Sequence, residues 1–493
     1  MMKTITIDPI TRLEGHGKIS IFLDEKGDVA NAYLQIPELR GFERFCQGRR
    51  AEDMPQITSR ICGVCPVAHH FAAAKALDAA FNVVPPSAAK KLRELMYCGY
   101  YIYDHILHFY YLGGPDFVVG PDAPAAKRNI LGVIEKAGLE IGKEVIKHRA
   151  YGQKITGILG GKATHPVCGL PGGVSKGLNK DEVKEIEKMG KSCVEFAKFS
   201  LKLFDDIVLK NKGYLDLILS DPYTLKTYNM GLVDKNNKVN FYDGEIRVTD
   251  QKGREHIKFD GKDYFKNIAE HVEEWSYIKF TYLKDIGWKG FKDGKDSGIY
   301  RVGPLGRLNA AEGMATSLAD KEYKRFFETL GGKAVNSTLA FHWARLIELL
   351  YATERVMELI KDPEITSTKI RNPVGEPGEG IGVTEAARGT LIHHYKLDKN
   401  GLIDKANLIV ATTNNAGAIN MSVRDAAKGI IKKGKVNDGL LNMVEMAFRA
   451  YDPCFACATH TLPGGMPLEV NIYDNNKKLY KTLRRNLWRK TIK

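Results

Sequence analysis

Two pairs of cysteines, one near each end of the chain, constrain the fold more than any other feature. Cys62 and Cys65 form one CxxC pair, and Cys454 and Cys457 form the other. Two cysteines with this spacing can direct both thiolates at one ion. Zinc ribbons place their pairs about 15–20 residues apart, whereas nearly the whole chain lies between these two. If both pairs share one site, the fold must bring the two ends of the chain together.

Two ordinary explanations of the cysteine pairs stay open at this point. One is a zinc site that holds a binding protein together. The other is a thioredoxin-like dithiol, which needs a strand–helix–strand context, while the flanks here read as helical. The single cysteines are expected to be buried small hydrophobic side chains; they are Cys46, Cys98, Cys168 and Cys193.

Composition excludes several classes of protein. The chain has 493 residues, of which 44% are hydrophobic and 27% charged, so a large core is available and disorder is disfavoured. A net charge of +14 raises nucleic acid as a partner. No zinc-finger spacing or aromatic RNA-reading signature accompanies that charge, so no nucleic-acid partner is expected. Without a signal segment or a run of about 18 apolar residues, we expect a cytoplasmic protein with no membrane span.

Hydrophobic periodicity predicts a small sheet followed by long helices. Residues 3–35 alternate apolar and polar side chains, with Asp24-Glu25-Lys26-Gly27 between two runs, which predicts an antiparallel sheet with one hairpin. Helical spacing predicts long helices over 87–112, 181–210 and 336–361. Three such helices favour a helical bundle as the core.

The middle of the chain differs from the rest in amino-acid composition. Residues 222–300 are rich in Asp, Lys, Gly and Tyr with short β-like runs, and we interpret them as an α+β excursion packed on the bundle. A Gly/Pro loop is predicted over 371–382, a buried strand over 402–411 and a helix over 436–450. The predicted fold class is therefore α+β and predominantly helical. The expected segments are a β-rich 1–50, a helical 51–221 with the first CxxC pair, the α+β excursion 222–300, a second helical part 301–460 with the second pair, and a C-terminal tail 461–493.

The flanks of the cysteines carry a resemblance to a known family. The first pair lies in Arg60-Ile61-Cys62-Gly63-Val64-Cys65-Pro66-Val67-Ala68-His69 and the second in Asp452-Pro453-Cys454-Phe455-Ala456-Cys457-Ala458-Thr459-His460. These segments resemble the first and last cysteine motifs of the nickel–iron hydrogenase large subunit. Further matches, in order, are Asp8-Pro9-Ile10-Thr11-Arg12-Leu13-Glu14-Gly15-His16, Arg40-Gly41-Phe42-Glu43, His165-Pro166, Gly172-Gly173, Glu385-Ala386-Ala387-Arg388-Gly389 and Thr412-Thr413-Asn414-Asn415. The resemblance covers essentially the whole chain.

The resemblance implies two metal sites. All four cysteines would hold nickel, with Cys65 and Cys457 bridging to an iron that carries carbon monoxide and cyanide, and with Cys62 and Cys454 terminal. Thiolates suit such soft metals. A magnesium ion would be bound by Glu43, His460 and the backbone carbonyl of Leu408, completed by waters. The alternative for Glu43 is an ion pair with Arg40 or Arg44.

The resemblance also implies a catalytic set. Dihydrogen is a very weak acid, so splitting it needs a metal and a nearby base. Glu14 matches the family's proton-transfer glutamate; without the motif it would be interpreted as a surface residue. Arg388, otherwise typical of a helix surface, would lie above the open face of the metals. Asp116 and Asp452 match carboxylates near the same pocket, although the sequence around Asp116 departs from the family pattern.

Three further residues would line the metal centre by similarity. His69 would hydrogen-bond a cysteine sulfur. Thr412 and Thr413 would line the cyanide pocket. The chain departs from the family pattern beside them, with Ala411 where a proline is common and Asn414 where a tryptophan is common.

The resemblance implies partner subunits. The single cysteines leave no set of four for an iron–sulfur cluster, so an iron–sulfur small subunit is implied. The sequences of residues 303–314 and 393–395 look most like those of the methyl-viologen-reducing, deazaflavin-non-reducing hydrogenases of methanogens. There, electrons from dihydrogen pass through an electron-transfer subunit to heterodisulfide reductase and ferredoxin. The family usually removes a tail such as 461–493 after nickel insertion.

Three alternatives remain at the sequence level. The closest is a related hydrogenase that reduces a deazaflavin coenzyme. A respiratory-complex relative of the same fold that has lost its metals is disfavoured by the four paired cysteines. A zinc-structured binding protein is the alternative from a different class.

Overall fold

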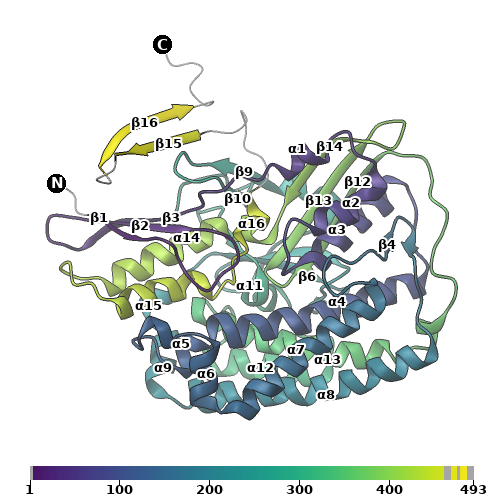
Figure 1. Ribbon diagram of the computed structural model, residues 1–493, viewed down its shortest axis with the longest axis horizontal. Coiled ribbons are helices and arrows are strands. Elements are labelled where there is room, and N and C mark those ends of the chain that lie inside the picture. Colours follow the sequence, from purple (N-terminus) through teal and green to yellow (C-terminus); the bar gives the residue numbers. More distant parts are fainter. Residues whose placement is uncertain (1–3, 460–467, 475–477, 486–493) are drawn as a thin grey trace.

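Long helices form the core of the molecule. The computed structural model describes residues 4–459, 468–474 and 478–485. Four long helices lie side by side: α4 (Ser87–Leu107), α7 (Leu139–Gly160), α8 (Lys180–Phe204) and α13 (Phe341–Leu359) (Figure 1). Helix α4 packs against α7 and α13, and α13 also packs against α8. The predicted helical bundle is therefore confirmed.

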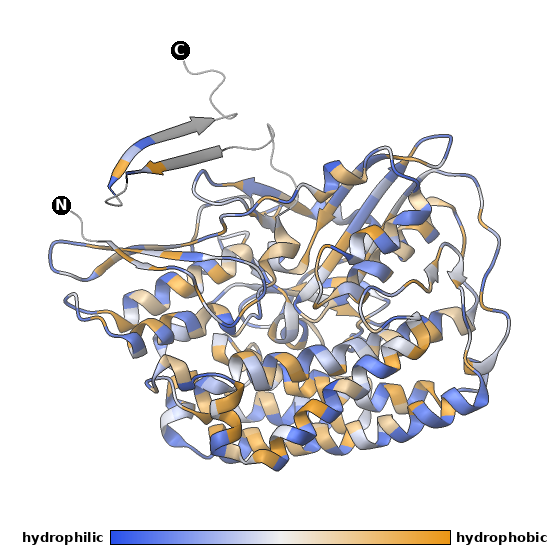
Figure 2. Cartoon of the chain, viewed as in Figure 1, coloured by the Kyte–Doolittle hydropathy of each residue, from blue (hydrophilic) through white to orange (hydrophobic). Residues whose placement is uncertain are grey.

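Local sequence explains where these helices begin and how they continue. Asn179 accepts hydrogen bonds from the first turn of α8, and the Glu182 carboxylate accepts one from the backbone N–H of Asn179, which together form a capping box. Both α4 and α8 continue as short π-helical segments, His108–Gly113 and Asp205–Leu209. Hydrophilic and hydrophobic residues alternate along these helices (Figure 2), as expected when one helix face packs and the other meets solvent.

The N-terminal strands form the predicted antiparallel sheet. Strands β1 (Thr4–Ile7), β2 (Lys18–Leu23) and β3 (Val29–Gln35) pair in that order. Strand β3 packs against α14 (Ala411–Ile430), a helix from the opposite end of the chain. The two ends of the sequence therefore meet in space, as a shared cysteine site requires.

The expected α+β excursion is present in the middle of the chain. Strands β6 (Tyr228–Val233), β7 (Glu245–Thr249), β8 (Glu255–Phe259) and β11 (Tyr300–Arg301) form a four-stranded sheet in the order β11-β6-β7-β8. Helix α10 (Tyr264–Asn267) leads into a two-stranded pair, β9 (Ile268–Val272) and β10 (Lys279–Leu283).

A third sheet lies directly on the helix that follows the first cysteine pair. Strands β12 (Glu379–Ala386), β13 (Gly389–Leu397) and β14 (Ile403–Ile409) are antiparallel, and β12 packs on α3 (Pro66–Ala80). At Gly380 a Cβ atom would lie 2.1 Å from the carbonyl oxygen of Ala76, so only glycine allows this approach.

Three predicted boundaries need correction. The Gly/Pro loop predicted over 371–382 ends earlier, because Gly380 and Gly382 belong to β12 and serve close packing rather than a turn. The strand predicted over 402–411 ends at Ile409, since Ala411 opens α14. The helix predicted over 336–361 begins only at Phe341.

The remaining elements complete the chain. They are α1 (Phe42–Cys46), α2 (Met54–Ser59), α5 (Pro115–Val118), α6 (Ile130–Ala137), α9 (Lys212–Ile218), α11 (Gly303–Ala310), α12 (Ser317–Thr329), α15 (Asp438–Arg449), α16 (Phe455–Ala458), β4 (Gly169–Leu170), β5 (Gly173–Val174), β15 (Leu468–Tyr473) and β16 (Leu479–Arg485). Within the described ranges, no helix is long and apolar enough to cross a membrane.

Candidate metal centre

The two CxxC pairs meet at one buried point. The four Sγ atoms of Cys62, Cys65, Cys454 and Cys457 all lie within 4.8 Å of one another. The shortest separations are 2.7 Å between Cys454 and Cys457 and 3.3 Å between Cys65 and Cys457. All four are free thiols with at most 4% of their surface exposed. Four converging soft donors form a ready set of ligands for nickel and iron.

Electrostatics favour a cation at this point. Burial raises the pKa values of the Cys454 and Cys457 thiols well above their usual range. Hydrogen bonds with the other three cysteines hold the pKa of Cys62 well below its usual range. A metal ion supplies the positive charge that lets all four thiols ionise together in a buried site. The donor set therefore fits a nickel–iron centre.

Two helix starts and backbone hydrogen bonds hold the two cysteine pairs in place. Cys65 directly precedes α3, and Cys454 directly precedes α16. The backbone N–H of Cys454 donates to the Oγ1 of Thr412, at 3.0 Å, near the start of α14. The N–H of Phe455 donates to the carbonyl oxygen of Glu14, at 3.0 Å. The N-terminal loop and the last cysteine motif thus lock together.

Glu14 reaches the cysteine group directly. The Cys454 thiol donates to its Oε2 at 2.8 Å, and the backbone N–H of Ala456 donates to the same oxygen at 3.2 Å. Burial raises the pKa of Glu14, and the nearby Cys62 charge adds to the rise. Glu14 is thus half-buried and bound to the last cysteine motif.

Arg388 stands between two buried carboxylates. It occupies the two-residue turn between β12 and β13, and not a helix surface. Its Nη1 atom lies 3.0 Å from Asp104 and its Nη2 atom 3.0 Å from Asp452. Among the described residues, Arg388 Nε and the Oδ1 atoms of both aspartates are buried with no hydrogen-bond partner. These atoms keep free capacity to donate or accept hydrogen bonds.

Asp116 occupies a different network from the one implied for it. Its two carboxylate oxygens bind Arg12 at 2.5 Å and Arg449 at 2.7 Å, and Asn442 donates to it at 3.0 Å. Arg388 pairs with the predicted Asp452 and with a second carboxylate, Asp104, which no sequence motif indicated. Asp104 lies inside α4 with no local motif of its own, and only its contact with Arg388, 284 positions away, reveals it.

The other predicted lining residues are buried. His69 Nε2 lies 3.5 Å from the Sγ of Cys457, and burial lowers the pKa of His69 to about 4. Thr413 lies beside Thr412 at the start of α14, and its carbonyl oxygen accepts from the Thr281 hydroxyl at 3.3 Å.

The predicted magnesium ligands are brought together in part. The Oε1 atom of Glu43 accepts a hydrogen bond from the backbone N–H of Leu408, at 2.8 Å, and Glu43 is only 6% exposed. His460 lies outside the described residues.

A second layer supports the turn that carries Arg388. Arg307 binds the carboxylates of Glu348, at 2.5 and 2.7 Å, and of Glu385, at 2.7 Å, with all three side chains fully buried. The same guanidinium donates to the carbonyl oxygens of Ala386, at 2.8 Å, and Ala387, at 3.1 Å. Sequence reasoning did not find Arg307, because its partners lie far away along the chain.

The single cysteines meet their expectation. Cys46, Cys98, Cys168 and Cys193 are buried free thiols. Burial raises the pKa values of Cys46, Cys168 and Cys193 to about 12. They behave as small hydrophobic side chains.

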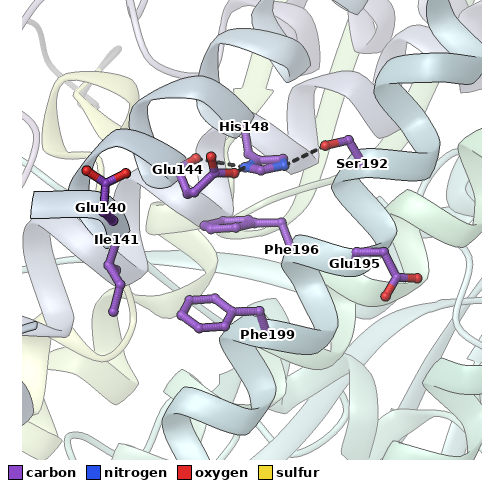
Figure 3. Close-up of a pocket in the computed structure, with 8 residues that line it drawn as sticks. All are labelled: Glu140, Ile141, Glu144, His148, Ser192, Glu195, Phe196 and Phe199. Carbon is purple, nitrogen blue, oxygen red and sulfur yellow. Dashed lines mark hydrogen bonds and ion pairs between the residues drawn. The ribbon is translucent and has the colours of Figure 1, made fainter. Parts of the chain in front are cut away.

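A separate surface cavity lies between α7 and α8. It has a volume of about 340 Å³, and Figure 3 shows His148 stacked over Phe196 inside it. Both ring nitrogens of His148 have partners, the carbonyl oxygen of Glu144 and the hydroxyl of Ser192. None of the eight lining residues belongs to the cysteine site.

Comparison with known proteins identifies the family. The protein-family model described as nickel-dependent hydrogenase matches residues 40–130 and 224–460, and the family model described as HoxL-like matches residues 4–39. The chain therefore belongs to the nickel-dependent hydrogenase family. It is the large subunit of a nickel–iron hydrogenase related to the F420-non-reducing hydrogenases.

Individual relatives support this assignment. An iron-sulfur subunit of the F420-non-reducing hydrogenase of Archaeoglobus profundus is 50% identical over 485 residues, which cover 98% of this chain and 100% of the relative. A vhu subunit of the F420-non-reducing hydrogenase of Methanocaldococcus jannaschii is 46% identical over 433 residues, covering 87% and 100%. The crystal structure of an NAD+-reducing NiFe-hydrogenase in the H2-reduced state superposes with a TM-score of 0.87 at 37% identity, covering 93% and 99%.

These findings exclude the two alternatives in which the chain is not a hydrogenase subunit. A zinc-structured binding protein and a metal-free respiratory relative are both excluded by the family match together with the four-cysteine group. Because the relatives are named as subunits, a partner subunit is implied for this chain.

Proposed function

We propose that this chain splits dihydrogen heterolytically, with Glu14 as the group that carries the proton away. The observation that carries this proposal is the 2.8 Å contact between Cys454 Sγ and Glu14 Oε2. A nickel–iron centre held by the four cysteines would supply the Lewis acidity and redox capacity that the cleavage requires. Cys65 and Cys457 are proposed as the bridging ligands, and Cys62 and Cys454 as the terminal ones.

Proton transfer from a thiol to a carboxylate needs hydrogen-bond contact and matched proton affinities. Glu14 meets the first condition through Cys454. Its raised pKa brings the carboxylate toward the range in which it can both accept and release a proton. The Ala456 N–H fixes the accepting oxygen in place.

Arg388 is proposed to hold a fixed positive charge beside the reacting atoms. Asp104 and Asp452 grip its two terminal nitrogens, so the guanidinium cannot swing away. Its free Nε is available to donate to a cyanide ligand on iron. Thr412 and Thr413, at the start of α14, are proposed to line the cyanide pocket. Asp116 is proposed to act through Arg12 and Arg449, the two arginines that its carboxylate binds.

A magnesium ion is proposed near Glu43 and Leu408, with His460 as a further ligand. The hydrogen bond from the Leu408 N–H to the Glu43 carboxylate supports it, because it holds the carboxylate beside the Leu408 backbone. Carboxylate and carbonyl oxygens are the ligands that magnesium prefers.

Electrons are proposed to leave through an iron–sulfur small subunit. An electron-transfer subunit, heterodisulfide reductase and ferredoxin are proposed as the later acceptors, by analogy with the relatives named F420-non-reducing hydrogenases, and the cytoplasm as the location. A deazaflavin coenzyme as acceptor is the alternative, and assays with each acceptor in the purified complex distinguish them.

Infrared spectroscopy of the purified, nickel-loaded complex tests the proposal. We expect bands from carbon monoxide and cyanide bound to iron, and proton/deuterium exchange under dihydrogen. A nickel-loaded sample without those bands would contradict the proposed centre.

A further inference from the structure

A column of three buried side chains leads away from one of the bridging cysteines. His69 Nε2 lies 3.5 Å from Cys457 Sγ, and His69 Nδ1 lies 3.1 Å from His393 Nε2. His393 Nδ1 lies 2.7 Å from the Tyr395 hydroxyl. The three side chains are at most 1% exposed. Each ring therefore contacts the next without solvent between them.

The fold places the three residues by two regular patterns. His69 is on the first turn of α3, directly after the first cysteine pair, and α3 packs against β13. His393 and Tyr395 are two residues apart on β13, so the strand pleat points both toward the interior. The intervening His394 points the other way and contacts Tyr264 and Glu379.

Counting hydrogen-bond donors and acceptors shows that each hydrogen bond of the column is donated toward Cys457. A metal-bound thiolate only accepts, while a neutral imidazole has one donor and one acceptor. His69 therefore donates from Nε2 to Cys457, and its Nδ1 must accept from the Nε2–H of His393. The Nδ1 of His393 must then accept from the Tyr395 hydroxyl. Burial raises the pKa of Tyr395 well above its usual range, so that hydroxyl keeps its proton.

We propose that His393 is a positioning residue of the metal centre, which with Tyr395 behind it fixes the tautomer of His69 and so aims an N–H at the Cys457 sulfur. A hydrogen bond to a ligating sulfur withdraws electron density from it, and hydrogen bonds of this kind around the ligands tune a metal site. The column therefore weakens electron donation from Cys457 to the metals. This inference rests on the proposed function, because it takes Cys457 as a bridging ligand.

Three variants of the purified complex test the column. His393→Phe removes both ring nitrogens, whereas His393→Gln keeps an N–H near the Nε2 position. His394→Phe is the matched control on the opposite face of the same strand. Nickel content and the infrared band of carbon monoxide on iron are measured for each.

We expect full nickel content in all three variants. In His393→Phe the carbon monoxide band shifts to lower frequency, because Cys457 donates more electron density once its hydrogen bond is lost. His393→Gln keeps the band near the wild-type position, and His394→Phe leaves it unchanged. If His393→Phe fails to fold, Tyr395→Phe provides the test, with a smaller shift in the same direction.

The outcomes separate this inference from the proposed function. A nickel-loaded His393→Phe variant with an unshifted band overturns the inference, as does an equal shift in His393→Phe and His393→Gln. Either result leaves the proposed function standing when the wild type shows its bands. A wild-type complex without nickel and without bands overturns the proposed function, and this inference with it.

Discussion

Two groups of side chains near the four cysteines, one around Arg388 and one around Glu14, differ in burial and in hydrogen bonding. On one side, Arg388 is clamped between Asp104 and Asp452, with at most 3% of any of these side chains exposed. On the other side, Glu14 receives its hydrogen bonds from a thiol and a backbone N–H, and it stays partly exposed. The first group therefore carries a clamped guanidinium, and the second carries a carboxylate that accepts a hydrogen bond from a cysteine thiol.

The supports behind the two sides differ as well. The Arg388 side rests on a second buried arginine, Arg307, which binds the turn before it. The Glu14 side rests on a loop that Arg12 ties to Asp116. Arg388 interacts electrostatically with Cys454 and Cys65, and Glu14 is hydrogen-bonded to Cys454, so a separate variant can test each group.

Replacing Glu14 is expected to have the largest effect on activity. Glu14→Gln keeps the size of the side chain but cannot take up the proton, so proton/deuterium exchange should fall about 10²–10⁴-fold. Nickel content should not change. Glu25→Gln, at an exposed turn, is the control and should exchange at the wild-type rate. Full exchange by a nickel-loaded Glu14→Gln variant would show that the proton leaves by another route.

Removing the support behind Arg388 comes next. Arg307→Met leaves the carboxylates of Glu348 and Glu385 buried without the arginine that neutralises them, which should cost about 3–5 kcal/mol of stability. Thermal unfolding of the complex measures the loss. Arg254→Met breaks only the ion pair between the exposed Arg254 and the half-buried Asp250, so its effect should be about 0–1 kcal/mol. Equal losses in both variants would contradict the importance of the buried layer.

Replacing Arg388 itself should change the reaction rate of the enzyme rather than the folding of the chain. Arg388→Lys keeps one positive charge but cannot bridge Asp104 and Asp452 together. Dihydrogen-dependent dye reduction should fall about 10²–10³-fold while nickel content stays at the wild-type level. An active Arg388→Lys variant would mean that a bidentate guanidinium is unnecessary.

Asp116→Asn should have the smallest effect and sharpens the comparison. It leaves Arg12 and Arg449 without their shared carboxylate, and should lower stability by about 1–3 kcal/mol. The rate of nickel-loaded enzyme should stay within a few-fold of wild type. A loss as large as that of Arg388→Lys would return Asp116 to the catalytic set.

Much of the fold was predictable from the sequence because it follows local periodicity. The long helices, the N-terminal sheet and the strands of 222–300 each depend on patterns within a few dozen residues. The four cysteines were predictable because their flanks match a family. Asp104 and Arg307 were not, since each is an ordinary helical residue until a distant partner is placed beside it.

The same reason explains what local sequence cannot show about three other residues. Arg388 looked like a helix-surface residue because its sequence favours a helix as much as a turn, and only pairing between β12 and β13 decides the matter. Asp116 looked like a pocket carboxylate, but Arg12 and Arg449 converge on it from both ends of the chain. His393 belongs to the segment 393–395 that carries part of the family resemblance, but only the contact between its ring and that of His69 places it behind the cysteines.

X-ray absorption at the nickel edge of the purified complex tests the central claim most directly, since it reports the atoms bound to nickel. The four converging sulfurs predict a nickel coordination sphere made mainly of sulfur, with less sulfur in a Cys454→Ser variant. Nickel surrounded by nitrogen and oxygen, or zinc in place of nickel, would contradict the account.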